Sequence, residues 1–269
     1  MQKPFLKWAG GKTRLCEKIN TVLPSGNRLV EPFVGSGAVF MNTEFDDYLL
    51  ADTNNDIINL YKHLQTEGQQ FIDYCKTFFI SSNNTQDEYL KNRVVFNTTL
   101  DIRLKSALFL YLNRHCFNGL CRYNKKGGFN VPFGKYDKPY FPENEMKAFY
   151  EKSKTATFIN ADFRVTMKNP VYGDVYYCDP PYVPLTDTAY FTSYTVGGFN
   201  IQDQEELRDL AISLREQDVP VLISNHSTDW TLENYSEAMI FEFDVQRSIS
   251  SKGNNRIKAK ELLALYKKL

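Results

Sequence analysis

Short apolar runs alternate with longer polar stretches along this chain. The runs cover residues 29–34, 48–51, 157–160, 175–178, 221–224 and 261–266. Their length and their bounding turn residues predict buried strands. Residues 205–215, between two of these runs, have apolar positions at helical spacing and predict an amphipathic helix. Strands separated by helices predict an α/β fold with a largely parallel sheet, which the last run could close.

Residues 56–114 have a different pattern. Leu60, Leu64 and Phe71 recur at helical spacing, as do Leu104 and Leu108 further on. The polar residues 81–85 between them predict a loop. This block therefore predicts helices that separate two sheet-forming parts of the chain.

Residues 116–138 are poor in Leu and Ile and rich in aromatic, Asn and Gly residues. Gly127-Gly128 between Tyr123 and Phe129 predicts a hairpin turn. The basic residues of this stretch outnumber its one acid, Asp137, and they are Arg122, Lys125, Lys126, Lys135 and Lys138. The segment is therefore a candidate surface for a polyanion.

The overall charge gives no such signal. The chain has 269 residues, and its 32 Lys and Arg residues balance its 32 Asp and Glu residues. A nucleic-acid partner then requires that only the contacting face be basic. The five cysteines are scattered without metal-ligand spacing, so we expect no metal and reduced thiols in a cytoplasm. No apolar stretch approaches the roughly 20 residues of a membrane span, and the start lacks the apolar run of a signal peptide.

The sequence Asp179-Pro180-Pro181-Tyr182 directly follows a predicted strand. Ligands bind at the carboxyl ends of strands in open α/β sheets. The prolines remove two N–H donors, which leaves the Asp179 carboxylate and the Pro180 carbonyl as acceptors beside the Tyr182 ring. Two acceptors can bind the N–H groups of an exocyclic amine and free its lone pair, while the ring stacks on a planar base. A proline-rich turn after a strand is the alternative interpretation.

A glycine turn, Gly35-Ser36-Gly37, follows the first predicted strand and precedes residues 38–41, which can open a helix. Such a turn allows a ligand to approach the backbone, and a helix N-terminus offers N–H donors. Asp52, at the end of the next strand, suits ribose hydroxyls, although a helix N-cap or turn role explains an acid there equally well. Gly10-Gly11-Lys12-Thr13 resembles a phosphate-binding loop, but no strand precedes it and the first glycine is missing.

Together these motifs resemble the Dam family of DNA adenine-N6 methyltransferases. The resemblance covers nearly the whole chain in the same order, at residues 5–12, 31–37, 51–52, 111–114, 118–124, 129–134, 179–182, 222–226 and 247–251. It implies a class I S-adenosylmethionine-dependent methyltransferase fold, with a mostly parallel seven-stranded sheet. It also implies that residues 1–55 and 145–269 form the catalytic domain, and that residues 56–144 form an inserted helical and β-hairpin DNA-recognition domain.

The resemblance assigns the cofactor, S-adenosylmethionine, which leaves as S-adenosylhomocysteine. The positions that match its binding residues are Trp8, Lys12, Asp52 and Asp179, with Phe33, Gly35 and Gly37 against its methionine part and Asp162 and Phe163 beside its adenine. The implied catalytic residues are Asp179, Pro180 and Tyr182.

The resemblance also implies that double-stranded GATC is the target and that the adenine is flipped out of the helix, since an amine inside a base pair cannot be reached. The residues that match base-reading positions are Lys7, at the first guanine, and Leu120, Arg122 and Pro132, at the far half of the site. Phe117, beside Asn118, stands where the family usually has a Tyr that inserts between bases. The candidate phosphate contacts are Arg93, Asn124, Asn130 and Lys135, for each of which a solvated surface role is the alternative.

Two further hypotheses stand beside this one. A methyltransferase acting on another amine or amide, such as an RNA base or a protein glutamine, would share the Asp-Pro-Pro-Tyr motif, although the basic segment disfavours a protein substrate. A DNA-binding protein without catalysis would not need Asp179, Tyr182, Asp52 and the glycines, all of which are present.

Overall fold

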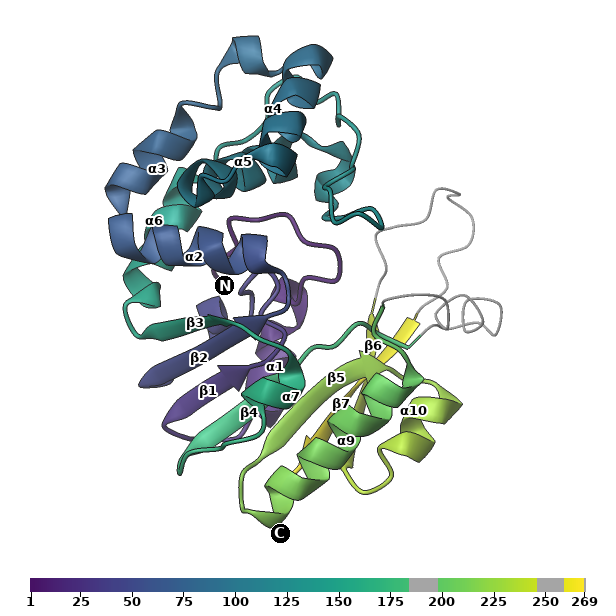
Figure 1. Ribbon diagram of the computed structural model, residues 1–269. Helices are drawn as coiled ribbons and strands as arrows, with labels where there is room; N and C mark the ends of the chain where they lie inside the picture. Colours follow the sequence, from purple (N-terminus) through teal and green to yellow (C-terminus); the bar gives the residue numbers. More distant parts are fainter. Residues whose placement is uncertain (184–197, 246–258, 269) are drawn as a thin grey trace. The chain divides into compact units, whose positions relative to one another are not determined.

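The computed structural model describes residues 1–183, 198–245 and 259–268 and is drawn in Figure 1. The chain divides into two compact units, and each is described by itself. The first unit comprises Met1–Cys16, Val34–Glu44 and Asp52–Asn160, and the second comprises Glu17–Phe33, Phe45–Ala51 and Ala161–Leu269. The whole of residues 56–144 therefore belongs to the first unit.

The sheet has seven strands in the order β3-β2-β1-β4-β5-β7-β6. The strands are β1 (Arg28–Glu31), β2 (Asp47–Asp52), β3 (Ala156–Asn160), β4 (Asp174–Cys178), β5 (Val221–His226), β6 (Met239–Val245) and β7 (Ala259–Tyr266). β1 pairs in parallel with β2 and β4, and β4 pairs in parallel with β5. The predicted α/β class and mostly parallel seven-stranded sheet are confirmed.

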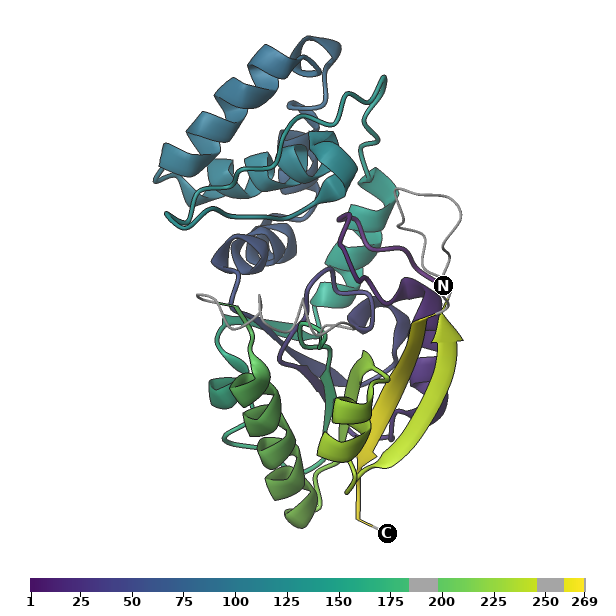
Figure 2. The ribbon, with the colours of Figure 1, turned by 90° about the vertical axis from the view of Figure 1, so that its right-hand side faces the viewer.

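The last apolar run does not close the sheet. β7 lies between β5 and β6 and is antiparallel to both, and β6 and β7 run side by side in Figure 2. The interior position explains why the side chains from Leu262 to Tyr266 are all buried. β6, which the apolar pattern did not predict, exposes Met239 and Phe241, as an edge strand can.

Two long helices of the first unit, α2 (Asn55–Glu67) and α5 (Ile102–His115), begin at side-chain caps. Asn54 caps α2 by accepting from the Asp56 N–H at 3.0 Å, and Asp101 caps α5 by accepting from the Leu104 N–H at 3.0 Å. Such caps satisfy N–H groups that have no partner inside the helix. The remaining helices of this unit are α3 (Gln69–Lys76), α4 (Gln86–Thr98) and α6 (Glu143–Ser153).

Helix α9 (Ile201–Glu216) of the second unit includes the predicted amphipathic segment. It begins with a capping box between Asn200 and Asp203 and packs on β5 and β7 (Figure 1). The other α-helices in the described residues of this unit are α1 (Cys16–Val22), whose first residue belongs to the first unit, α7 (Phe163–Thr166) and α10 (Asp229–Asn234).

No α-helix follows the glycine turn, so that expectation is wrong. β1 ends at Glu31, and residues 38–42 contain only a 3-10 turn, Phe40–Asn42. Thr43 returns to extended backbone (φ −121°, ψ 159°) before β2 begins, which leaves no room for a longer helix. The turn therefore offers no helix N-terminus to a ligand.

The predicted hairpin turn is present without strands beside it. Tyr123 and Phe129 form one isolated antiparallel bridge, and Gly127 has a φ of +77°. The backbone of Phe129 is bound by a side chain of α4, since Asn97 accepts from its N–H at 2.8 Å and donates to its carbonyl at 3.1 Å. Two backbone hydrogen bonds join the arms, from the Asn124 N–H to the Gly128 carbonyl and from the Asn130 N–H to the Arg122 carbonyl, and the contacts to the helix support them.

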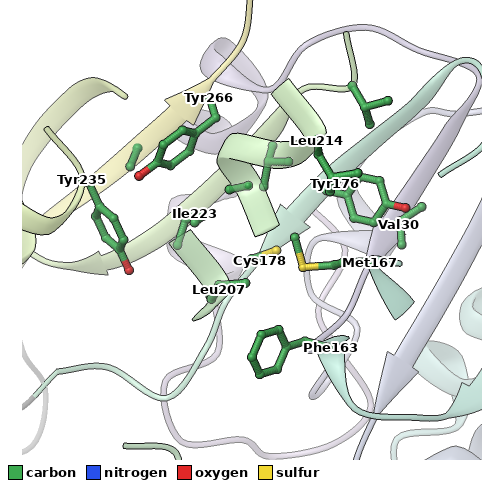
Figure 3. Close-up of a cluster of buried hydrophobic side chains, with 14 of the residues drawn as sticks. Val30, Phe163, Met167, Tyr176, Cys178, Leu207, Leu214, Ile223, Tyr235 and Tyr266 are labelled. Carbon is green, nitrogen blue, oxygen red and sulfur yellow. The ribbon is translucent and has the colours of Figure 1, made fainter. Parts of the chain in front are cut away.

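Each unit has its own apolar core. In the second unit, Tyr176 and Cys178 of β4 pack with Leu207 of α9, Ile223 of β5 and Tyr266 of β7 (Figure 3). The first unit has an aromatic core, whose rings are those of Phe5, Phe40, Tyr61, Phe149 and Phe158. Each unit can therefore hold its candidate site residues on a rigid base.

None of the helices in the described part of the chain combines the length and the apolar character that crossing a membrane requires.

Candidate functional site

Asp179 begins the loop that leaves the carboxyl end of β4. The pairing of Cys178 with Ile223 in β5 brings the next residue of each strand, Asp179 and Ser224, face to face. The Ser224 hydroxyl donates to Asp179 Oδ1 at 2.9 Å. The predicted position at a strand end is thus confirmed, and the carboxylate is oriented by a neighbouring strand that the sequence pattern did not identify as its partner.

Tyr182 is held from two sides. Its hydroxyl donates to Glu261 Oε2 at 3.1 Å, and its ring meets His226 edge-to-face with centroids 4.6 Å apart. Burial raises the pKa of Tyr182, and the negative charge of Asp179 raises it further. The hydroxyl therefore stays protonated and donates, which holds the ring in one orientation.

The glycine turn in the first unit binds Asp52 directly. The Gly35 N–H donates to Asp52 Oδ2 at 3.0 Å, and the Asn54 N–H donates to Asp52 Oδ1 at 2.9 Å. Burial raises the pKa of Asp52, and these two N–H groups oppose the shift. Asp52 is not the N-cap of α2, because Asn54 occupies that position. Asp52 does stabilise the glycine turn through its bond to Gly35. A carboxylate has about four acceptor sites, so two remain for hydroxyl donors.

Gly35 and Trp8 are in close contact. Gly35 has a φ of +47°, and a side chain there would begin 3.0 Å from Trp8 Nε1. The Tyr61 hydroxyl donates to the Gly35 carbonyl at 2.6 Å. Glycine at position 35 therefore allows both the positive φ and the close packing of the Trp8 indole on the turn. Gly37 also has a positive φ, +71°.

Beside Asp52 the first unit has a hollow of about 350 Å³. Its lining residues are Thr53, Asn54, Asn55, Asp56 and Tyr123. The Tyr123 hydroxyl donates to Asp56 Oδ2 at 2.7 Å, which links the basic segment to the start of α2.

The segment with Lys7, Trp8 and Lys12 is anchored by the end of α5. Asn113 accepts from the Lys7 N–H at 2.9 Å and donates to the Lys7 carbonyl at 2.8 Å. Lys12 Nζ donates to the Gly10 carbonyl at 2.9 Å, and no strand leads into this loop, so the rejection of a phosphate-binding loop is confirmed. These contacts give residues 111–114 a role as an anchor for the N-terminal segment.

Three aromatic rings meet in the second unit. Phe33 and Phe163 stack with centroids 5.6 Å apart, and Phe199, which the sequence did not single out, lies 5.5 Å from each. Asp162 caps α7, with its Oδ1 accepting from the Arg164 N–H at 2.9 Å, and the Arg164 guanidinium pairs with the same carboxylate. The structure thus brings Phe33 and Phe163 together and gives Asp162 a capping role as well.

Two candidate DNA-contacting residues of the first unit, Lys7 and Asn118, meet at Tyr136. Lys7 Nζ lies 4.0 Å from the centre of the Tyr136 ring, and the Asn118 N–H donates to the Tyr136 hydroxyl at 3.0 Å. Gly119 also approaches Lys7 so closely that a side chain at 119 would begin 2.3 Å from Lys7 Cβ. Lys7, Phe117 and Asn118 are therefore neighbours, and only the folded chain shows that Tyr136 joins them.

Arg122, Pro132 and Lys135 lie exposed in the same segment, and Leu120 is half-buried. The Arg122 guanidinium donates to Asn130 Oδ1 at 2.9 Å and to the Asn130 carbonyl at 3.2 Å. These two bonds hold the planar guanidinium group in one orientation before any ligand binds.

Asn124 and Arg93 have structural partners. Asn124 Oδ1 accepts from the N–H groups of Lys126 and Gly128 at 2.9 and 3.0 Å, and Arg93 Nη1 donates to the Val131 carbonyl at 3.1 Å. Asn124 therefore stabilises the turn, and Arg93 holds the backbone that follows it, whatever further contacts they make. Residues 247–251, part of the family resemblance, lie outside the described residues.

The sheet order defines the class of protein. A parallel sheet completed by an antiparallel strand inserted between β5 and β6 is the class I methyltransferase fold. Because a fold does not by itself define a substrate, the comparison with known proteins decides which methyltransferase this is. Residues 8–249 match the family of D12 class N6 adenine-specific DNA methyltransferases, and the chain belongs to that family.

Proteins named DNA adenine methylase are similar over the full chain. The one from Serratia marcescens is 50% identical, covering 98% of this chain and 98% of its own. The one from Vibrio cholerae is 52% identical, covering 98% and 96%, and the one from Escherichia coli is 47% identical, covering 98% and 95%. The predicted family and enzyme class are thus confirmed: the chain is an adenine-specific DNA methyltransferase, and DNA is its substrate.

Proposed function

We propose that this chain transfers the methyl group of S-adenosylmethionine to N6 of an adenine flipped out of double-stranded GATC, acting on DNA in the cytoplasm. The observation that carries the chemistry is the Asp179 carboxylate at the end of β4, oriented by Ser224. The choice of GATC rests on the resemblance at Lys7, Leu120, Arg122 and Pro132 and on the name of the relatives. Residues 56–144 would form the target-recognition domain, and residues 1–55 and 145–269 the catalytic domain.

The residues of the first unit fit a nucleoside cofactor. Asp52 retains acceptor sites for ribose hydroxyls, and Gly35 lets the Trp8 ring pack directly on the turn that binds Asp52. In the second unit, the half-buried Phe33 ring offers aromatic surface, and the buried Phe163 ring beside Asp162 supports it from behind. We assign Trp8, Lys12, Gly35, Gly37 and Asp52 of the first unit, with Phe33, Asp162, Phe163 and Asp179 of the second, to this cofactor.

The chemistry follows from the acceptors of the motif. The Asp179 carboxylate and the Pro180 carbonyl each accept one N–H of the adenine amine. This pulls the nitrogen toward tetrahedral geometry and frees its lone pair, while Tyr182 stacks on the base and Glu261 and His226 hold its ring. When bound, S-adenosylmethionine supplies an electrophilic methyl group. The proton that the amine loses leaves toward Asp179, and positioning provides most of the rate enhancement.

The test is methyl transfer from labelled S-adenosylmethionine to two duplexes that differ only in GATC against GTAC. We expect N6-methyladenine, identified by mass spectrometry of the digested DNA, in the GATC duplex alone. Asp179→Asn keeps the shape of the side chain and should lower the rate at least about 10²-fold, the range for one preorganised electrostatic group. Equal labelling of both duplexes would overturn the GATC assignment, and faster labelling of an RNA of the same sequence would favour the alternative substrate.

A further inference from the structure

A cluster of buried polar side chains lies directly behind the Asp-Pro-Pro-Tyr motif. Gln204 of α9, Asn225 of β5 and Tyr235, which follows α10, are each at most 1% exposed. They lie in the second unit beside its apolar core, where Tyr235 and Leu207 are labelled in Figure 3. Burying amide groups in such surroundings is costly unless each finds a partner.

Gln204 holds the backbone in the middle of the motif. Its Nε2 donates to the Pro181 carbonyl at 2.7 Å. Its Oε1 accepts from Asn225 Nδ2 at 3.1 Å and from the Tyr235 hydroxyl at 3.2 Å. These two donors on Oε1 determine that the Nε2 end of the amide faces the motif.

Asn225 holds the motif on the other side of Tyr182. Its Oδ1 accepts from the Val183 N–H at 3.1 Å and from its neighbour, the His226 N–H, at 2.9 Å. His226 Nδ1 in turn lies 2.8 Å from the Val183 carbonyl. The backbone is therefore bound at residues 181 and 183, immediately before and after the tyrosine.

This arrangement has a physical reason in the prolines. Pro180 and Pro181 have no N–H, so that part of the loop can be anchored only through its carbonyls. The φ of Pro181 is also locked by its ring. Once Gln204 holds the Pro181 carbonyl and Ser224 holds the Asp179 carboxylate, little freedom remains for the Pro180 carbonyl between them.

We propose that Gln204 and Asn225 are positioning residues for methyl transfer, which orient the Pro180 carbonyl and the Tyr182 ring through the backbone of residues 181–183. The inference rests on the proposed transfer to a flipped adenine, and it is independent of GATC recognition. A buried polar network whose groups are all satisfied fixes one geometry of the backbone that it binds, and the backbone bound here is that of the motif itself.

The first test is Gln204→Met, which keeps the length of the side chain and removes the donor to Pro181. Gln217→Met is the control, since Gln217 is exposed just after α9 and its Nε2 donates to the Ser213 carbonyl. We expect the single-turnover rate of methyl transfer to fall roughly 10- to 100-fold, as for a misplacement of about 1 Å. The Kd values for S-adenosylmethionine and for the duplex should change less than about threefold. The proposal is overturned if Gln204→Met transfers the methyl group as fast as the control variant. It is also overturned if the affinities for S-adenosylmethionine and for the duplex both fall as much as the rate does.

A gentler pair of variants decides the matter if Gln204→Met does not fold. Tyr235→Phe removes one donor from Gln204 Oε1. Tyr266→Phe changes an equally buried tyrosine that packs edge-to-face on Tyr235, and its hydroxyl has no hydrogen-bond partner among the described residues. Burial raises the pKa of both hydroxyls, so both are protonated at any working pH. We expect Tyr235→Phe alone to slow single-turnover transfer, and equal rates for the two variants contradict the inference.

The rates are measured on whichever duplex the wild-type enzyme methylates. Methylation of adenine outside GATC therefore overturns only the target assignment. Normal transfer by Gln204→Met and Tyr235→Phe overturns only the positioning inference.

Discussion

At the scale of single residues, Phe117 shows how a substitution within a motif can be judged from its surroundings. Its ring is 49% exposed although it is a large apolar group. Its N–H donates to the Pro132 carbonyl at 2.9 Å, and Asn118 after it adopts a left-handed conformation with a φ of +54°. The turn thus presents the ring to solvent from a fixed backbone, which suits insertion into a base stack better than a core role.

We predict that Phe117→Ala will lower kcat/KM on the GATC duplex roughly 5- to 150-fold. The decrease corresponds to about 1–3 kcal/mol of stacking per base. When 2-aminopurine replaces the target adenine, the variant should also produce a smaller rise of fluorescence on binding the duplex than the wild type does. Phe117→Tyr should stay within about threefold of wild type, because the ring that stacks is kept.

Tyr172→Ala is the matched control. Tyr172 is 96% exposed, but it precedes the amino end of β4, whereas the motif follows the carboxyl end. If both alanine variants behave alike, the exposed ring of Phe117 has no special role.

At the scale of elements, α5 is a helix whose last ten residues, from Ser106 to His115, are all buried. His115 ends it, with Nδ1 lying 2.8 Å from the Tyr111 carbonyl and the two rings in contact. Burial lowers the pKa of His115 to about 4, and the nearby positive charge of Lys7 acts in the same direction. The helix that anchors the N-terminal segment therefore contains an uncharged histidine at neutral pH.

This shift gives the free energy of unfolding a definite pH dependence. Below pH 6.5 the unfolded chain binds a proton at His115, while the folded chain does not until about pH 4. Stability therefore declines as the pH falls from 6.5 toward 4, by about 1.4 kcal/mol per pH unit, or about 2 kcal/mol at pH 5.

Urea unfolding at pH 7 and pH 5 measures the effect. His115→Asn should remove that part of the difference between the two pH values. His63→Asn should keep it, since His63 is a half-buried residue of α2 beside Glu67. An unchanged pH difference in His115→Asn would show that His115 is not the responsible group.

At the scale of the whole molecule, zero net charge conceals a local basic surface. The formal charges cancel over the 269 residues, yet the segment from Cys116 to Lys138 has five basic residues against one acid. Arg122, Lys125, Lys126, Lys135 and Lys138 are all exposed. Binding to DNA requires that the contacting surface be basic, and it does not require a positive net charge on the whole chain.

We predict that replacing Lys125 and Lys126 together by Ser will weaken duplex binding and flatten its salt dependence. For each DNA phosphate that the variant no longer neutralises, the slope of log K against log salt should decrease by about 0.9. Fluorescence anisotropy at several salt concentrations measures that slope.

Replacing Lys267 and Lys268 by Ser changes the charge equally. These exposed lysines follow Tyr266, which pairs with Val221 at the amino end of β5, opposite to the end that carries Ser224. An equal change of slope in both double variants would mean that net charge alone controls binding.

The sequence by itself determined six of the seven strands, all but β6, and the places of the motifs. Buried strands appear as short apolar runs because both faces of a parallel sheet are covered, and Asp179 follows such a run. Elements governed by local chemistry were likewise predictable: the amphipathic pattern of α9 and the glycine turn at residues 35–37, whose positive φ angles need glycine.

The tertiary structure alone decided which distant residues meet. Ser224 reaches Asp179 because β4 and β5 are neighbours in the sheet, and Gln204 reaches Pro181 because α9 packs on β5. Tyr136 meets Lys7 across a large separation in sequence. The periodicity of apolar residues encodes which face of an element is buried, but it does not encode its partner or its register. For that reason the Asp-Pro-Pro-Tyr motif could be found in the sequence, and the side chains that hold it in place could not.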